Sequence, residues 1–305
     1  MILLRGLYKT ALSRWCGVAI ALASLAAPGC AVRRTTKVNP SLVPPPSQQT
    51  TLTDLVGRVN AWSSSIRTLI ATTDLEPQAG SVYSGVIREY HDVKGFILLE
   101  KPATIRILGQ APIVRTKIFD MVSNGDEFRV YVAPKEKFIV GKNASRRPAK
   151  NALENLRPQH ILDALLVPAI DPSREKVFPE EAEEGGRRYY VVNVLEAAPG
   201  GDLALRRKVW FDRSSLEIAR MQIYGPQGSY TEGVEYSEYR DFQGVRYPTR
   251  VHLNRPIEDY GLTITVQKAT FNQPIEAEKF LLEKPEKAQL VDLTASAQAE
   301  GPGGQ

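Results

Sequence analysis

Side chains able to do chemistry are few in this chain and lie far apart. The histidines are His91, His160 and His252, and the cysteines are Cys16 and Cys30. A zinc site needs His or Cys ligands at short, characteristic spacings, and none of these residues has such a spacing. The sequence also lacks a Gly-x-Ser-x-Gly nucleophile motif and a glycine-rich phosphate loop. We therefore expect no enzymatic activity and no metal or other cofactor.

One acidic run could suggest calcium. Glu180-Glu181-Ala182-Glu183-Glu184 places four carboxylates within five residues. A calcium loop instead spaces Asp and Asn ligands at alternate positions around a glycine. We interpret the run as a solvated surface.

Cys30 is the residue for which the sequence predicts a definite chemical modification. Residues 1–14 carry basic side chains, and Trp15–Ala27 form an apolar run, as in a bacterial export signal. The run is shorter than the roughly 20 apolar residues that span a bilayer. Ala27-Pro28-Gly29-Cys30 resembles a lipobox, which predicts cleavage after a signal peptide of residues 1–29 and acylation of the Cys30 thiol. An ordinary signal peptide and an uncleaved anchor are the alternatives.

The charge distribution supports this interpretation of the N-terminus. The 305 residues contain 39 Lys and Arg against 34 Asp and Glu, a net charge of +5. Asp54 is the first acidic residue and six basic residues precede it, so the rest of the chain carries 33 positive and 34 negative charges, or −1. The excess basicity therefore belongs to the export signal and to a tether over residues 30–50, which contains Pro44-Pro45-Pro46 and is expected to be extended. We expect no nucleic-acid partner.

Two segments have helical spacing. From 51 to 70, apolar residues recur every three or four positions, and Thr51 and Asp54 resemble a capping box at the start. Residues 153–167 repeat the spacing, with Pro158 suited to a first helical turn.

The rest of the folded body has the short, alternating, turn-punctuated pattern of antiparallel strands. Asn124-Gly125 predicts a hairpin turn. Residues 168–188 appear as a charged, proline-containing connection, and 284–305 as a disordered tail. The predicted class is α+β, mainly β, with a strongly curved antiparallel sheet as an incomplete β-barrel and helices on its concave face. One domain spans 51–283. The later strands are expected at Tyr189–Leu195, Leu203–Phe211, Glu217–Tyr224, Ser229–Tyr239, Gly244–Leu253 and Leu262–Phe271.

The chain resembles the LolA/LolB-like periplasmic lipoprotein-sorting family. The resemblance rests on the order of signal, tether, helix and meander, on Tyr236–Leu253 (YSEYRDFQGVRYPTRVHL), and on Phe96–Asp120 with its KPATIRI strand. It implies a half-barrel closed by helices around an apolar cavity that accepts acyl chains. It also implies a buried polar contact that holds a helix shut, for which the sequence identifies no residue.

Burial of an acyl chain contributes about 25 cal/mol per Å², so an apolar inner face would bind one. Ordinary core packing is the alternative role for every residue in such a cavity. The candidate cavity residues are Leu55, Val59, Trp62, Ile66, Phe96, Ile107, Phe119, Val130, Ile161, Leu162, Leu165 and Val209.

Two functional hypotheses follow. In the first, the chain is a lipid-anchored envelope lipoprotein that binds acyl chains of lipids or lipoproteins and acts in lipoprotein sorting or envelope biogenesis, with a periplasmic carrier or envelope protein as partner. In the second, the same scaffold is a non-enzymatic sensing or protein-interaction module. Ala31 after Cys30 favours a periplasm-facing place in the outer membrane, and retention in the inner membrane stays open.

Overall fold

A computed structural model describes residues 46–80, 88–89, 93–144, 157–198 and 200–294. The chain divides into two compact units, Met1–Pro44 and Pro45–Gln305, and the described residues belong to the second. That unit has its own hydrophobic core and is therefore expected to fold without residues 1–44. Within the described ranges, no helix combines the length and apolarity needed to cross a membrane.

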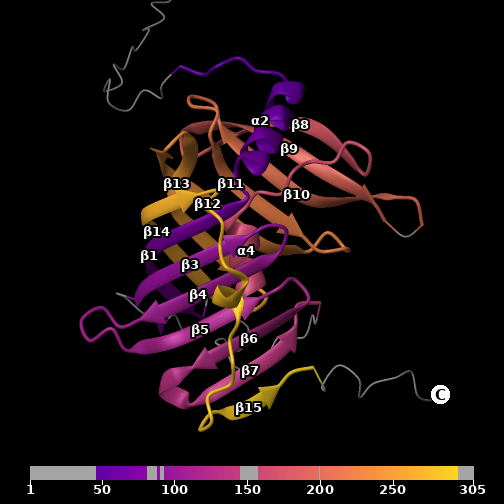
Figure 1. The fold of residues 1–305 in the computed structure, drawn as a ribbon. Helices are drawn as coiled ribbons and strands as arrows, with labels where there is room; N and C mark the ends of the chain where they lie inside the picture. The colour runs from indigo at the N-terminus through magenta and orange to yellow at the C-terminus, as the bar shows by residue number, and fades with distance from the viewer. Residues whose placement is uncertain (1–45, 81–87, 90–92, 145–156, 199, 295–305) are drawn as a thin grey trace, which may run out of the picture. The chain divides into compact units, whose positions relative to one another are not determined.

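The described body consists of a single open sheet and two α-helices (Figure 1). The order across the sheet is β15-β7-β6-β5-β4-β3-β1-β14-β13-β12-β11-β10-β9-β8, with the short β2 paired to β1 alone. Every pairing is antiparallel except β15 with β7. The predicted class, mainly β with an open curved sheet and helices, is confirmed. The helices are α2 (Leu52–Ser65) and α4 (Pro158–Leu165). The strands are β1 (Thr68–Ala79), β2 (Arg88–Glu89), β3 (Val93–Glu100), β4 (Thr104–Gln110), β5 (Lys117–Ser123), β6 (Glu127–Val132), β7 (Lys137–Lys142), β8 (Glu175–Glu184), β9 (Arg187–Ala197), β10 (Leu203–Asp212), β11 (Ile218–Tyr224), β12 (Tyr230–Phe242), β13 (Val245–Arg255), β14 (Tyr260–Phe271) and β15 (Gln289–Asp292).

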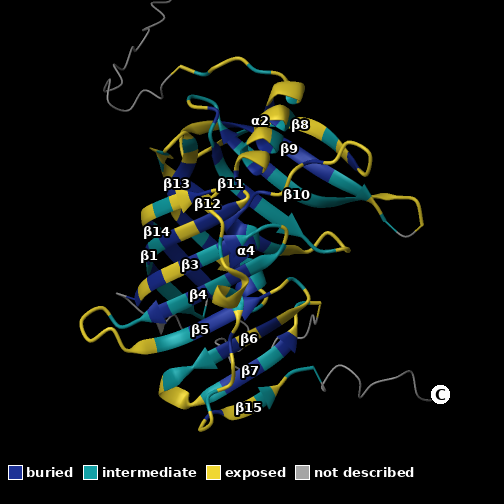
Figure 2. Cartoon of the chain, in the orientation of Figure 1, coloured by how far each residue is buried: buried dark blue, intermediate teal, exposed yellow. Residues whose placement is uncertain are grey.

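The sheet has an inner face, which packs against both helices, and an opposite outer face. Buried and exposed residues alternate along many strands because successive side chains point to opposite faces (Figure 2). One continuous hydrophobic core joins residues of α2, α4 and the inner face. Helix α4 lies beside β4, β5 and β13, while α2 lies beside β9.

Local signals in the sequence begin several elements as expected. Thr51 caps α2 through its hydroxyl, which accepts from the Asp54 amide, and the Asp54 carboxylate accepts from the Thr51 amide. Pro158 opens α4. Gly125 has a φ of +98° in the β5–β6 turn, a conformation that glycine adopts without strain.

The first helix is shorter than predicted. It ends at Ser65, and residues 68–70, expected as helix, begin β1. Strand β1 pairs with β14 on one side and β3 on the other, so it lies centrally in the sheet. Ladder hydrogen bonds on both edges favour the strand over a helical continuation at Leu69 and Ile70. For the second helix, 157 and 166–167 lie outside α4, and 153–156 are outside the described residues.

The charged connection expected over 168–188 contains a strand. Strand β8 carries the acidic run at the sheet edge, where its carboxylates pair with basic residues of β10, of β11 and of the turn between them. Glu180 lies 2.9 Å from Lys208, Glu184 2.8 Å from Arg220, and Glu181 2.7 Å from Arg213. Charges and Pro179 on an edge strand also discourage pairing with other chains.

The tail expected to be disordered from 284 onward is ordered as far as 294, and 295–305 lie outside the described residues. Residues 277–292 run over the outer face of β4 to β7, and β15 then pairs with the β7 edge (Figure 1). Arg106 donates to the Lys279 carbonyl and Arg129 to the Leu282 carbonyl, while Leu282 is buried on this face. These contacts order a segment that has little local structural signal, so the domain extends about ten residues beyond its predicted end.

Candidate functional site

The inner face under α2 and α4 is the region where the candidate cavity residues meet. Leu55, Val59 and Ile66 of the α2 segment are buried in the common core, as are the apolar residues of α4 that face the sheet. Trp62 and Phe119 are half-buried against the same core. The candidates that the structure brings together on this face are Leu55, Val59, Trp62, Ile66, Ile107, Phe119, Val130, Ile161, Leu162, Leu165 and Val209.

The prediction that Phe96 lines the cavity on the inner face is wrong. Its neighbours Gly95 and Ile97 are buried, and the period of two along β3 turns Phe96 to the outer face with 41% of its surface exposed. Phe119 lies on the inner face across Gly109, where an added Cβ would come within 2.4 Å of the ring. The absence of a side chain at Gly109 therefore makes room for Phe119.

Two tyrosine hydroxyls hold α4 against the sheet. Tyr236 of β12 donates to the Ala164 carbonyl at 2.9 Å, and Tyr247 of β13 donates to the Leu165 carbonyl at 2.9 Å. Burial raises the pKa of both phenols far above the usual range, so they stay neutral donors. This is a buried polar contact on a helix, of the kind the resemblance implied. Both tyrosines lie in the segment 236–253, although nothing in the sequence showed that their hydroxyls would reach a helix.

Tyr247 also links α4 to α2. Its ring stacks on Trp62 with centroids 5.8 Å apart, and the Trp62 indole donates to the Arg246 carbonyl at 3.0 Å. Tyr247 is fully buried. One side chain therefore contacts both helices that cover the inner face.

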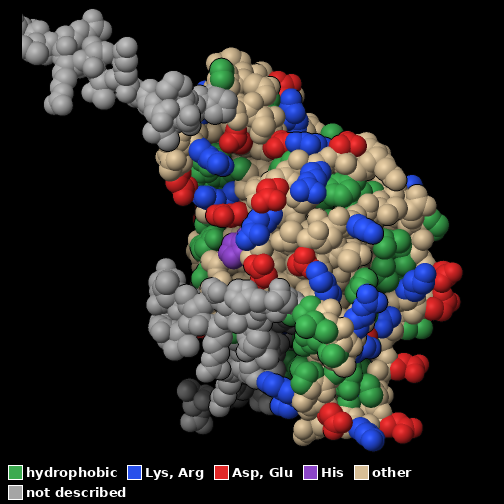
Figure 3. Space-filling model, turned by 90° about the vertical axis from the view of Figure 1, so that its left-hand side faces the viewer, with side chains coloured by type: hydrophobic (Ala, Val, Ile, Leu, Met, Phe, Trp, Pro, Cys, Tyr) green, Lys and Arg blue, Asp and Glu red, His purple; other side chains and the backbone are tan. Residues whose placement is uncertain are grey.

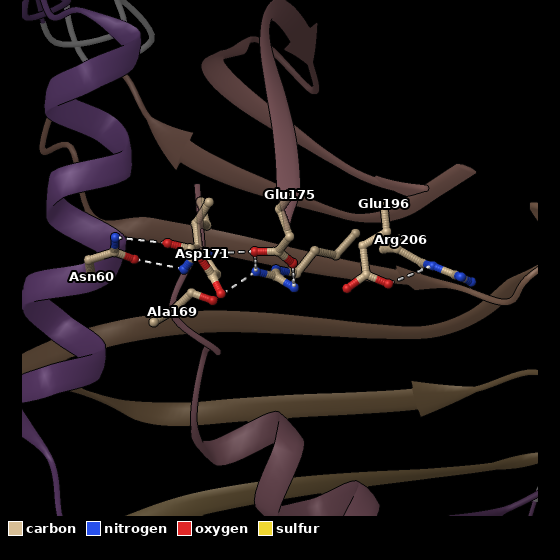
Figure 4. A network of polar contacts seen from close by, with 8 residues as sticks. Asn60, Ala169, Asp171, Glu175, Glu196 and Arg206 are labelled. Carbon is tan, nitrogen blue, oxygen red and sulfur yellow. Dashed lines mark hydrogen bonds and ion pairs between the residues drawn. The ribbon is translucent and has the colours of Figure 1, made fainter. Parts of the chain in front are cut away.

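The loop 166–175 after α4 is attached to α2 by hydrogen bonds. Figure 4 shows Asn60 of α2 facing the backbone of this loop. Its side-chain amide donates to the Ile170 carbonyl at 3.1 Å, and its oxygen accepts from the Ile170 amide at 2.7 Å. Val167 and Ile170 of the loop are buried in the core.

The same loop is attached to β10 by a buried ion pair (Figure 4). The Arg207 guanidinium contacts both oxygens of Glu175, at 2.7 and 3.0 Å, and donates to the Ala169 carbonyl at 3.0 Å. Glu175 also accepts from the Asp171 amide at 2.8 Å. A two-point guanidinium–carboxylate contact has a defined geometry, so the C-terminal side of α4 is firmly attached.

A second polar group lies on the inner face under the first turn of α4, and we call it the ionic cluster. From the sheet it contains Glu232 of β12, Arg255 of β13, Glu258 of the following turn and Tyr260 of β14. Arg255 forms ion pairs with Glu232 and, at 2.7 Å, with Glu258. Only 1% of Glu232 is exposed. Its Oε1 atom and the Arg255 Nε atom are buried without a hydrogen-bond partner.

Helix α4 and its flanking residue supply the rest of the ionic cluster: Arg157, His160 and Asp163. His160 Nδ1 lies 2.7 Å from the Tyr260 hydroxyl. Burial lowers the pKa of His160 well below its usual value, assisted by the charges of Arg255 and Arg157, so the ring is neutral. Burial raises the pKa of Asp163, although the Gln159 amide and Arg255 act in the opposite direction.

Glu232 has the most informative ionisation in the cluster. Burial raises its pKa to about 7, and the nearby charges of Asp163 and Glu258 act in the same direction while Arg255 opposes them. The carboxyl therefore titrates near neutral pH. In the part of the chain that the structure covers, no group of three or more acidic, His or Cys side chains is placed to hold a metal ion.

His252 is not part of this site. His252 projects from the opposite face to Val251 and Leu253, and its Nδ1 lies 3.0 Å from the Thr263 hydroxyl. His91 falls outside the described residues.

Comparison with solved structures places the fold among known architectures. A DUF1329 family protein from Desulfovibrio piger is 13% identical, with 75% of this chain and 95% of that chain covered at a TM-score of 0.50. Also similar is a domain described as an outer membrane lipoprotein-sorting protein from Vibrio parahaemolyticus, which is 10% identical, with 74% of this chain and 94% of that chain covered at a TM-score of 0.47. A LolA superfamily protein from Nitrosomonas europaea is 10% identical, with 74% of this chain and 97% of that chain covered at a TM-score of 0.45.

No protein-family model and no curated protein sequence matches the chain. At 13% identity, the likeness to the Desulfovibrio protein shows the fold alone. LolA-like and lipoprotein-sorting proteins are among the structural neighbours.

Proposed function

We propose that the chain is an envelope lipoprotein whose inner face binds acyl chains of lipids or lipoproteins when α4 moves away from the sheet. The observation that carries the proposal is the position of α4, an eight-residue helix whose apolar side covers the inner face. An acyl chain in its place would meet the same apolar side chains, at a gain of about 25 cal/mol per Å² buried. The role is one of binding, without a chemical step.

Helix α4 is suited to move because little of its stability is its own. Isolated helices shorter than about 12 residues are marginal in water. No side chain caps its N-terminus, and Tyr236 and Tyr247 bind its last carbonyls. Its structure therefore depends on the contact with the sheet, which a ligand can replace.

An exposed hairpin supports contact with a lipid surface. Ile113 is 90% exposed and Val114 71% exposed in the connection between β4 and β5, next to Arg115 and Lys117. Figure 3, which views the side from which this connection projects in Figure 1, shows hydrophobic side chains among Lys, Arg, Asp and Glu in its lower right part. Apolar side chains beside basic ones suit an anionic membrane surface.

The anchor and the location belong to the same proposal. Cys30 would carry the covalent lipid, and residues 30–50 would hold the body near the periplasmic side of the outer membrane, within reach of a carrier protein. Two or three acyl chains anchor a protein stably. Labelling with radioactive palmitate in cells tests the anchor: the label should be incorporated into the wild-type protein and lost in Cys30→Ser.

Uptake of a fluorescent fatty acid by the soluble unit Pro45–Gln305 tests the binding role. Tyr236→Phe and Tyr247→Phe each remove a hydrogen bond, worth about 1 kcal/mol, that exists only while α4 lies on the sheet. Each variant should therefore raise the population with α4 open, and with it the affinity for the probe, about fivefold. Tyr239→Phe is the matched control, since the Tyr239 hydroxyl donates to the Ile218 carbonyl and not to α4.

Native mass spectrometry of the same unit should show a co-purified fatty acid or phospholipid. A spectrum without lipid, together with no probe uptake by the wild type and by both tyrosine variants, would contradict acyl binding. That outcome would favour a protein-interaction role for the scaffold.

A further inference from the structure

We infer that α4 opens from its N-terminal end, pivoting on the loop 166–175, and that the ionic cluster under its first turn is a latch whose strength depends on pH. This inference rests on the proposed function for its purpose. The direction in which α4 opens is inferred from the contacts at its two ends.

The two ends are attached differently. After α4, the loop is bound to α2 through Asn60 and to β10 through the Glu175–Arg207 pair, and its apolar residues lie in the core. Removing one member of such a buried pair is strongly unfavourable, so this loop stays attached while α4 itself leaves the sheet, together with the Ala164 and Leu165 carbonyls that Tyr236 and Tyr247 bind. The loop is therefore the pivot.

The N-terminal end is attached partly through Arg157, which lies over the Phe128 ring and donates to the Asn143 carbonyl, and partly through the ionic cluster, whose groups water would solvate well. Glu232 and Arg255 each keep one buried polar atom without a partner, and a buried atom of this kind costs free energy until water reaches it. Lifting the first turn exposes both. Opening at this end therefore restores hydration to two such atoms, whereas opening at the other end, where Arg207 Nε is the buried atom without a partner, would also break the Asn60 and Glu175 contacts.

Glu232 makes the latch depend on pH. The described groups that interact with its charge are Arg255 and Glu258 of β13 and its turn, Asp163 of α4, and Tyr230, Tyr236 and Tyr260 of β12 and β14. Arg157 and His160 interact with Arg255. In the closed state the pKa of Glu232 is about 7, and in the open, hydrated state it returns towards the usual 4.5. The closed state holds this proton more tightly, so it is favoured below pH 7 and loses that advantage as the pH rises through 7. Between pH 6 and pH 8 this effect raises the open population about tenfold.

His160 acts in the opposite direction. Its pKa is well below 6.5 when α4 is closed, so an exposed imidazole binds a proton more readily and acidification favours opening. At pH 6 an exposed histidine of ordinary pKa is protonated in roughly three-quarters of molecules, which favours opening about fourfold relative to pH 8. The net change for the wild type from pH 6 to pH 8 is then a rise of about two- to threefold. The closed state is most stable on the mildly acidic side of neutrality.

Hydrogen–deuterium exchange of the α4 amides in the unit Pro45–Gln305 measures opening without any lipid. After correction for intrinsic exchange rates, the ratio of open populations at pH 8 and pH 6 should be about two to three for the wild type. It should rise to about ten in His160→Asn, which removes the imidazole, and fall to about one-quarter in Glu232→Gln, which removes the carboxylate.

Glu235→Gln is the matched control. Glu235 lies on the same strand as Glu232 but is exposed and 3.6 Å from Arg220, so its variant should keep the wild-type ratio. Amides of the central strand β1 should show no comparable change, which separates local opening from global unfolding.

A wild-type ratio retained in Glu232→Gln would overturn the latch, and earlier exchange in 166–171 than in α4 would overturn the pivot. Failure of acyl binding itself would show as absent probe uptake while these exchange ratios stay as expected. The two proposals therefore fail in different measurements.

Discussion

The two helices on the inner face differ in how they are attached. Helix α2 has 14 residues, a complete capping box and two buried positions in the common core, Leu55 and Val59, and its Trp62 is bound to the β13 backbone. Helix α4 has eight residues, no side-chain cap, and a polar cluster under its first turn. A helix with its own capping contacts and a long apolar stripe is expected to be a fixed part of the domain, which we call a wall. A short helix that is held by its neighbours can leave the sheet, and we call it a cover.

The largest expected difference comes from placing a charge under each helix. Val59→Asp should lose more than about 4 kcal/mol, because a carboxylate in the core under α2 can escape only by unfolding. Leu162→Asp should cost less, because α4 can leave the sheet while the sheet stays folded. Urea unfolding followed by circular dichroism measures both, and Ala61→Asp on the exposed side of α2 is the control. Equal losses in the two variants would mean that the helices are equally integral to the fold.

The pivot gives the next largest effect. Glu175→Ala should destabilise the protein by about 3 kcal/mol, because Arg207 is then left buried without its partner. Glu183→Ala breaks an exposed pair with Arg188 at 3.4 Å and should change stability by less than about 0.5 kcal/mol. If the two variants unfold at the same urea concentration, the loop after α4 is not the firm end.

A smaller effect is expected at the link between α2 and the pivot. Asn60→Ala removes both hydrogen bonds to the Ile170 backbone and leaves that backbone unpaired, a loss of about 2 kcal/mol. Exchange of the amides in 166–171 should then increase. Ser64→Ala on the exposed side of α2 should leave it unchanged, and an equal response in both variants would argue against the link.

The smallest effect is expected at the α2 cap. Thr51→Ala should lower the melting temperature by about 3 °C, because the Asp54 amide loses its acceptor. Thr53 is exposed, lies two residues after Thr51 and caps nothing, so Thr53→Ala should lower the melting temperature less. A large increase in α4 exchange in Thr51→Ala would show that α2 is less independent of α4 than their contacts indicate.

Sequence patterns predicted the regular parts of this domain well and its ends poorly. Strands β9 to β14 lie within a few residues of their expected positions, because long alternating runs between turn residues leave little choice of register. Strand β8 was missed because glutamates of its acidic run pair with side chains such as Lys208 and Arg220 that lie elsewhere in the chain. Strand β15 was missed because a four-residue strand has too few residues to show a period.

The candidate site was predicted in part. Apolar residues on helical or alternating spacing reached the inner face, whereas Phe96 did not because its strand register turns it outward. The tyrosines that bind α4 and the members of the ionic cluster carry no local signal, since the contacts that join α4 to the sheet link residues about 70 to 100 positions apart, as Tyr236 with Ala164 and His160 with Tyr260 do.

What the sequence determined by itself is local: the cap at Thr51, the helix start at Pro158, the turn at Gly125 and the alternation that makes the strands. These features depend on hydrogen bonds and steric preferences within a few residues, so neighbouring residues are sufficient to specify them. The tertiary structure decided which helix is a wall and which a cover, and it buried Glu232 beside Arg255 under α4. Burial and ionisation depend on what surrounds a side chain in space, and only the folded chain provides those surroundings.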